Sequence, residues 1–118
     1  MSSPDPKRGE IWLVDFSPSQ GAEIQKKRPA LVVSVSSVGR LPLRIVVPIT
    51  DWKPNYASLV WFVELQPDTT NGLSKPSGAD AFQVKSVALG RFTSRMGVVT
   101  AAQLEDVAAA IAVCVGAP

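Results

Sequence analysis

Three consecutive basic residues, Lys26, Lys27 and Arg28, stand directly before a proline and an apolar run. Pro29 disfavours the helical conformation at Arg28 and favours the extended one, and the composition of residues 30–35 is typical of a strand. A polar loop therefore ends in positive charge at the edge of a rigid element. Because a guanidinium group offers a fixed fork of donors that matches a phosphate, this edge is the first candidate for chemistry on an anionic substrate.

Histidine is absent from the chain, and Cys114 is the single cysteine. The absence of histidine excludes a Ser-His-Asp triad, a histidine-paired thiol, a two-histidine nuclease and the common zinc sites. Any catalysis must use arginine, lysine, carboxylates, hydroxyls or backbone groups. Cys114 cannot form an internal disulfide, and we expect it to pack as a small hydrophobe in an apolar helix.

The elements that must position these residues are mostly short strands followed by one helix. Apolar runs rich in β-branched and aromatic residues predict the strands, over residues 10–16, 30–35, 44–49, 58–65, 81–89 and 96–99. Three consecutive apolar residues, 31–33, predict a strand that is covered on both faces. Turn-forming residues predict a loop over 66–78. Thr100 and Gln103 form a capping-box pattern before a helical periodicity that Gly116 can end. We predict a mainly β fold, a small sheet or barrel with a C-terminal helix.

Length and composition predict one globular domain. The chain has 118 residues, of which 46% are hydrophobic and 19% charged, enough for one core. Its longest apolar run, residues 107–115, is far shorter than the roughly 20 residues that span a bilayer. The first residues have no apolar core, so we expect a flexible leader over 1–7 of a cytoplasmic protein rather than a signal peptide. The net charge of +2 permits a nucleic-acid partner without requiring one.

Several ordered segments closely resemble the signature of the MazF/PemK (Kid) toxins. They are RGEIWLVD at 8–15, Pro18 with GAE at 21–23, KRPALVVS at 27–34, VPIT at 47–50, QVKS at 83–86 and the closing helix at 100–115. The resemblance implies an SH3-like or CcdB-like barrel of five to seven strands, usually a homodimer. It also implies the toxin of a type II toxin-antitoxin system, an endoribonuclease that cleaves single-stranded messenger RNA sequence-specifically, needs no metal or cofactor, and inhibits translation and growth. The partner would be a MazE-like antitoxin with an acidic tail.

The resemblance assigns catalytic roles to Arg28 and Thr50. RNA carries its own nucleophile, the ribose 2′-oxygen, so the enzyme needs a proton acceptor, a stabiliser of negative charge and a proton donor. Arg28 would stabilise the transition state, and Thr50 would contact the scissile phosphate or the 2′-oxygen. The alternatives are a surface salt bridge of Arg28 with Glu10 or Glu23, and a turn-capping hydroxyl at Thr50.

The sequence departs from the family pattern at Phe82, where many members have an aspartate. Asp80 lies two residues earlier, on the same face of the predicted strand, and is the third catalytic candidate. The resemblance and the local composition also give a set of candidate RNA-binding residues: Gln25, Lys26, Lys27, Trp52, Gln83 and Ser86. Lys26 and Lys27 either position phosphates or are merely solvated. We expect Trp12, Trp61 and Phe62 to be core or dimer contacts rather than base-stacking platforms.

Two other classes of function remain open on the sequence. One is a catalytically weak nucleic-acid-binding protein, or a CcdB-like poison of a topoisomerase, on the same barrel. The other is an SH3-like protein-interaction module, which leaves the basic edge at residues 26–29 unexplained.

Overall fold

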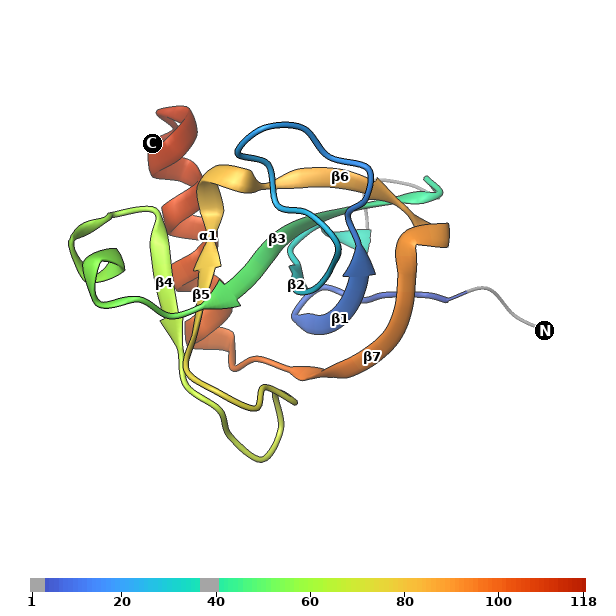
Figure 1. The fold of residues 1–118 in the computed structure, drawn as a ribbon, viewed down its shortest axis with the longest axis horizontal. Helices are drawn as coiled ribbons and strands as arrows, with labels where there is room; N and C mark the ends of the chain where they lie inside the picture. Colours follow the sequence, from blue (N-terminus) through green and yellow to red (C-terminus); the bar gives the residue numbers. More distant parts are fainter. Residues whose placement is uncertain (1–3, 37–40) are drawn as a thin grey trace.

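The computed structural model describes residues 4–36 and 41–118. These residues form seven strands, three short 3-10 turns and one helix (Figure 1). The elements are β1 (Glu10–Asp15), β2 (Lys27–Val32), β3 (Leu43–Asp51), η2 (Pro54–Ser58), β4 (Phe62–Leu65), β5 (Ser77–Asp80), η3 (Ala81–Gln83), β6 (Lys85–Ala88), η4 (Leu89–Arg91), β7 (Phe92–Val98) and α1 (Ala101–Val115). The predicted class, mainly β with a C-terminal helix and five to seven strands, is confirmed. No helix in the described part of the chain is long and apolar enough to cross a membrane.

The strands pair antiparallel in the order β4-β5-β3-β2-β1-β7, and β6 pairs with β3. The sheet does not close, because β4 and β7 lie at its two ends. The nine-residue β3 organises this arrangement: β6 and β2 pair with its first part, and β5 pairs with its last three residues. One side of β3 therefore changes partner near Pro48.

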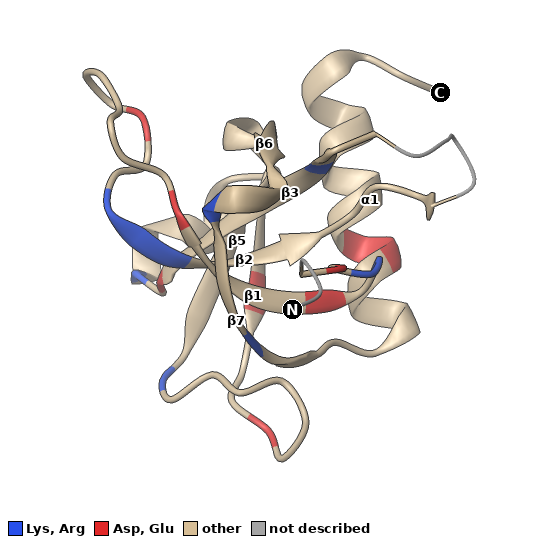
Figure 2. Cartoon of the chain, turned by 90° about the vertical axis from the view of Figure 1, so that its right-hand side faces the viewer, with Lys and Arg blue, Asp and Glu red and all other residues tan. Residues whose placement is uncertain are grey.

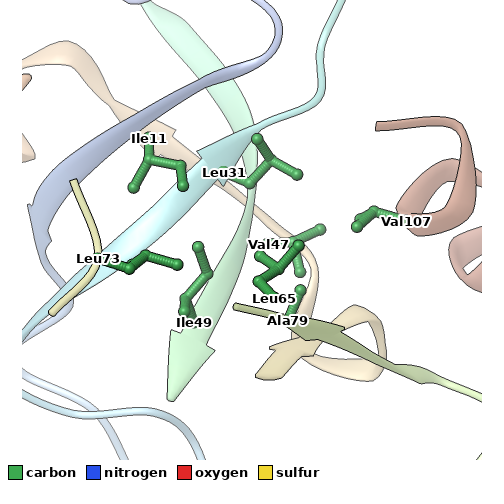
Figure 3. Close-up of a cluster of buried hydrophobic side chains, with 8 residues drawn as sticks. All are labelled: Ile11, Leu31, Val47, Ile49, Leu65, Leu73, Ala79 and Val107. Carbon is green, nitrogen blue, oxygen red and sulfur yellow. The ribbon is translucent and has the colours of Figure 1, made fainter. Parts of the chain in front are cut away.

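The two central strands are buried on both faces, as predicted for residues 31–33. Ala30 and Val32 of β2 belong to one cluster of buried side chains, and Leu31 between them belongs to the other. Neighbouring side chains of a strand point to opposite faces, so the sheet separates two cores. The cluster that contains Leu31 joins the sheet to α1 through Val107 (Figure 3).

The helix begins and ends as its sequence predicts. The Thr100 hydroxyl accepts from the Gln103 amide while the Gln103 side chain accepts from the Thr100 amide, which completes the capping box. Gly116 ends the helix with a φ of 69°. Val107 is fully buried, and Cys114 is half-buried on the same helix.

The strand predicted over 81–89 is wrong in its first half. Strand β5 lies earlier, at Ser77–Asp80, the chain then makes the turn η3, and β6 covers only Lys85–Ala88. Strand β5 was not predicted because its residues, SGAD, include none of the β-branched or aromatic residues that are enriched in strands. Gly78 packs tightly between two rings: a Cβ there would lie 3.1 Å from ring atoms of both Trp52 and Phe62, which would have to shift by a few tenths of an ångström.

Other boundaries also differ from the predicted ones: β2 covers Lys27–Val32 instead of 30–35, so Lys27 and Arg28 belong to the strand, and β3 continues beyond 49 to Asp51. The strand predicted over 58–65 begins only at Phe62, because η2 and a turn precede it, and β7 extends further toward the N-terminus than 96–99. The predicted leader lies partly outside the described residues. Its described part is docked, since Pro6 is buried and its carbonyl accepts a hydrogen bond from Arg44 Nε at 2.9 Å.

Candidate functional site

Arg28 and Thr50 line the same cavity, which opens where β2 and β3 part. The pairing of these strands runs from Val32↔Val46 to Ala30↔Pro48. The same register, continued by two residues, places Thr50 opposite Arg28. β2 and β3 no longer pair at this point. The opposite edge of β3 pairs with β5 there, where Thr50 faces Gly78. A cavity of about 200 Å³ lies at this point, lined by the first residues of β2, the last residues of β3 and the loop before β5.

The guanidinium of Arg28 has an unused donor. Its Nε is buried, and no described residue offers it a hydrogen-bond acceptor. The two carboxylates considered as surface partners are engaged elsewhere: Glu10 pairs with Arg95 Nε at 2.8 Å, and Glu23 accepts from the Gln20 amide at 3.0 Å. A buried donor without a partner costs about 1–3 kcal/mol, and because Nε has almost no solvent-exposed surface, an acceptor reaches it only when neighbouring groups move.

Further charges surround the same cavity. Lys27 lines it beside Arg28, and Figure 2 shows the basic stretch at residues 26–28 leading into β2. Lys75 and Asp51 also line it and form an ion pair, with Nζ and Oδ1 3.1 Å apart. Sequence reasoning missed Lys75, because it stands in a polar loop with no motif to mark it. Only the pairing of β5 with the end of β3 brings that loop to the cavity.

Asp80 does not line the cavity of Arg28 and Thr50. It lies at the far end of β5 from Ser77, three residues or roughly 10 Å along the strand. The carboxylate is buried and accepts from the Phe82 amide at 3.2 Å and from Gln83 Nε2 at 3.3 Å. Burial raises the pKa of Asp80 above its ordinary value, against the opposing effect of these hydrogen bonds. Its hydrogen bonds connect it to the turn η3 and not to Arg28 or Thr50.

Gln83, a predicted RNA-binding residue, holds the loop between β1 and β2. Its Oε1 accepts from the Ile24 amide at 2.6 Å, and its Nε2 donates to the Ala22 carbonyl at 3.3 Å and to Asp80. The side-chain amide thus fastens the loop that precedes the basic residues. Gln83 also lines a second cavity, of about 380 Å³, together with Pro48 and the exposed Phe82.

The remaining candidates lie outside the Arg28 cavity. Gln25 and Lys26 are exposed on the loop, where Lys26 has a φ of 66°. Trp52 is half-buried, packs over Gly78, and contacts Tyr56 edge-on. Ser86 is exposed on β6 and lines a separate cavity of about 630 Å³. The structure therefore brings together Arg28, Thr50 and Lys27 from the predicted set.

The three aromatic residues expected to be core or dimer contacts are all half-buried. Trp12 packs edge-on against Phe92, and Trp61 packs edge-on against Phe82. Phe62 stacks on Tyr56 with ring centroids 3.8 Å apart. In this chain their rings serve packing within the fold.

Solved structures with the same arrangement are MazF proteins and related endoribonucleases. MazF from Deinococcus radiodurans superposes with a TM-score of 0.78 at 24% identity, covering 94% of this chain and 96% of that one. A mycobacterial endoribonuclease, solved in complex with its cognate antitoxin, superposes with a TM-score of 0.74 at 19% identity, covering 97% and 98%. At these identities the likeness defines the fold.

The sequence comparison goes further and defines the family. Residues 7–115 match the model of the PemK-like, MazF-like toxins of type II toxin-antitoxin systems. Endoribonuclease MazF9 of Mycobacterium tuberculosis is 38% identical over 104 residues, 83% of this chain and 86% of that protein. Endoribonuclease PemK of Escherichia coli is 47% identical over a shorter stretch of 47 residues, 39% of this chain and 35% of that protein. The chain belongs to the PemK/MazF toxin family.

Proposed function

We propose that this toxin is an endoribonuclease that cleaves single-stranded RNA sequence-specifically and without a metal ion. The observation that carries the proposal is the cavity that Arg28 and Thr50 line together, with Lys27 beside them. A phosphodiester brings negatively charged acceptors to the guanidinium, and charge-assisted hydrogen bonds are about twice as strong as neutral ones. The endoribonuclease names of its sequence relatives support the same activity.

The reaction begins at the ribose next to the scissile phosphate. The 2′-oxygen loses its proton and attacks phosphorus, and the bond from phosphorus to the 5′-oxygen of the next nucleotide breaks. That oxygen takes up a proton, which leaves a 2′,3′-cyclic phosphate and a 5′-hydroxyl end. The nucleophile belongs to the substrate, so the protein supplies positioning, proton transfer and charge stabilisation.

Arg28 is the group suited to charge stabilisation. Negative charge develops on the non-bridging phosphate oxygens during the attack, and a fixed guanidinium inside a partly buried cavity stabilises it without reorganisation. Thr50 lies on the opposite strand, so its hydroxyl can bind the same phosphate or the 2′-oxygen. Asp80 has no part in this step of the proposal, because it lies outside the cavity.

The proposal extends to the partners. A MazE-like antitoxin would lay an acidic tail over the cations of this cavity and compete with RNA, and the toxin would act as a homodimer in the cytoplasm. The mycobacterial structural neighbour solved in complex with its cognate antitoxin supports such a partner. Competition is tested by adding antitoxin to an RNA-binding assay. Antitoxin that binds without displacing RNA contradicts the shared site.

Cleavage is tested with purified protein and a long single-stranded transcript in the presence of EDTA. We expect wild type to cut, and Arg28→Ala and Thr50→Ala to lose about 100-fold or more in rate. Arg8→Ala is the matched control, since Arg8 is exposed and lies outside the cavity. Uncut RNA, or equal cutting by wild type and Arg28→Ala, rejects the proposal. A transcript with deoxyribose at a mapped cut site tests the nucleophile, because continued cutting there excludes the 2′-oxygen.

A further inference from the structure

The loop between β4 and β5, residues 66–76, has a conformation fixed by hydrogen bonds and close packing. Asn71 is fully buried at its centre. The Asn71 side chain donates to the Gln66 carbonyl at 2.8 Å and accepts from the amides of Asp68 and Leu73 at 3.3 and 3.0 Å. One buried amide thus satisfies three backbone groups of the loop, which fixes its path.

The same loop is held closely against β7. Gly72 has a φ of 73°, and a Cβ there would lie 2.2 Å from the Met96 carbonyl oxygen. A Cβ on Gly97 would lie equally close, 2.2 Å, to the Thr70 carbonyl oxygen. The Val98 amide donates to that Thr70 oxygen at 2.9 Å. Backbone therefore packs on backbone, so the loop has little room to move.

Lys75 lies near the C-terminal end of this loop, where the loop lines the cavity. Its carbonyl accepts from the Ser77 hydroxyl at 2.8 Å, and the next carbonyl, of Pro76, accepts from the Trp52 amide at 3.0 Å. Its ammonium pairs with Asp51, but the two side chains are 62% and 55% exposed. Exposed ion pairs of this kind are weak, so an incoming anion can replace the carboxylate.

We propose that Lys75 is a second phosphate-binding residue of the RNA site, which Asp51 holds in place until RNA displaces the carboxylate. The inference rests on the proposed function, because it concerns the same site. The cavity is lined by three cations, Lys27, Arg28 and Lys75, and by one carboxylate, Asp51. The net charge of these side chains is +2, and one phosphodiester, with a single negative charge, does not neutralise it. A chain that binds Arg28 through one phosphate therefore meets further positive charge at Lys75.

The test compares Lys75→Ala with Lys7→Ala. Lys7 is a matched control, because it forms the same kind of ion pair with Asp5, at 2.7 Å and with side chains 59% and 61% exposed, away from the cavity. On a long single-stranded transcript we expect Lys75→Ala to raise KM about tenfold with kcat nearly unchanged. Lys75→Arg should restore KM. Asp51→Asn should lower KM, because it removes the competing carboxylate.

A binding experiment keeps the inference separate from the cleavage activity. Labelled random-sequence single-stranded DNA has no 2′-hydroxyl and cannot be cut, and its affinity is measured at several salt concentrations. The logarithm of the affinity falls with the logarithm of salt by about 0.7 per phosphate contact on a single strand. Lys75→Ala should reduce this slope by about 0.7, and Lys7→Ala should leave it unchanged.

The outcomes decide the two claims independently. If wild type cleaves RNA while Lys75→Ala matches Lys7→Ala in KM and in salt slope, the role of Lys75 is rejected and the endoribonuclease stands. If wild type cleaves nothing, the proposed function falls, and the salt slope alone decides whether Lys75 binds phosphate. A higher KM for Asp51→Asn rejects displacement of its carboxylate.

Discussion

At the scale of single residues, the proposed role of Arg28 depends on the shape of its guanidinium. Among the described residues Nε has no hydrogen-bond acceptor, and lysine has neither this donor nor the planar fork that matches a phosphate. We therefore predict that Arg28→Lys keeps the positive charge yet lowers kcat about 100-fold, with no loss of folding stability. Cleavage rates at saturating RNA, together with urea unfolding, check both parts. Retention of more than half the wild-type rate would show that charge alone suffices.

Asp80 makes a different prediction, about stability and pH. Burial raises the pKa of its carboxyl above 3.8, the ordinary value. At pH values between the pKa of Asp80 in the unfolded chain and its raised pKa in the folded protein, the folded protein binds more protons than the unfolded chain. The free energy of unfolding therefore falls as pH rises through this interval. Asp80→Asn cannot ionise and lacks this dependence. The free energy of unfolding of wild type, minus that of Asp80→Asn, should decrease as pH rises above 3.8.

Urea unfolding at a series of pH values between acid and neutral measures this difference. Taking the difference cancels the other carboxylates. The hydrogen bond from Gln83 that Asp80→Asn loses shifts the size of the difference, so the direction of its change with pH is what is compared. Asp106→Asn, on the exposed face of α1, is the control for the loss of one carboxylate charge. A difference that grows with pH would mean that the carboxyl is stabilised in its ionised form.

At the scale of elements, the loop over residues 66–76 depends on Asn71. Its side chain satisfies three backbone groups of that loop from a fully buried position. Asn71→Ala leaves them without partners, so we predict a loss of about 2–3 kcal/mol in the free energy of unfolding. Asn55→Ala, at an exposed position of η2, should change it by less than about 0.5 kcal/mol. Equal stability of the two variants would show that water replaces the lost hydrogen bonds.

The loop between β1 and β2 depends in the same way on Gln83. Removing its side chain frees the Ile24 amide, which now donates to Oε1 at 2.6 Å. We predict that Gln83→Ala speeds hydrogen exchange at the Ile24 amide by about tenfold, the effect of one hydrogen bond of ordinary strength. Gln20→Ala, in the same loop but exposed, is the control. Unchanged exchange at Ile24 would show that other contacts hold the loop.

What the sequence predicts at this scale depends on how local its causes are. The extended conformation at Arg28 follows from Pro29, and the helix start follows from Thr100 and Gln103, so both were predictable from neighbours in the chain. Strand β5, and the close packing against β7 of the predicted loop that carries Lys75, were not. Gly78 fits between rings of Trp52 and Phe62, and Gly97 fits against Thr70, contacts between residues distant in sequence.

At the scale of the whole molecule, the candidate site is part of the core that α1 covers. Ile49 and Leu73 belong to the buried cluster that contains Val107, shown in Figure 3, and both also line the cavity of Arg28. The three consecutive apolar residues 31–33 predicted two covered faces. The sequence could not show that the cavity lies at the end of one of these faces. The position of the cavity depends on where β3 stops pairing with β2 and begins to pair with β5.

This shared core predicts that site and fold are lost together. Val107→Ala removes two methyl groups from a fully buried position, so we expect it to lower the free energy of unfolding by about 2 kcal/mol. Val113→Ala, on the same helix but 59% exposed, should change it by less than about 0.5 kcal/mol. In both proteins RNA cleavage and circular dichroism should decline over the same range of urea. Cleavage that disappears at lower urea than the circular dichroism signal would show that the cavity opens separately from the core beneath it.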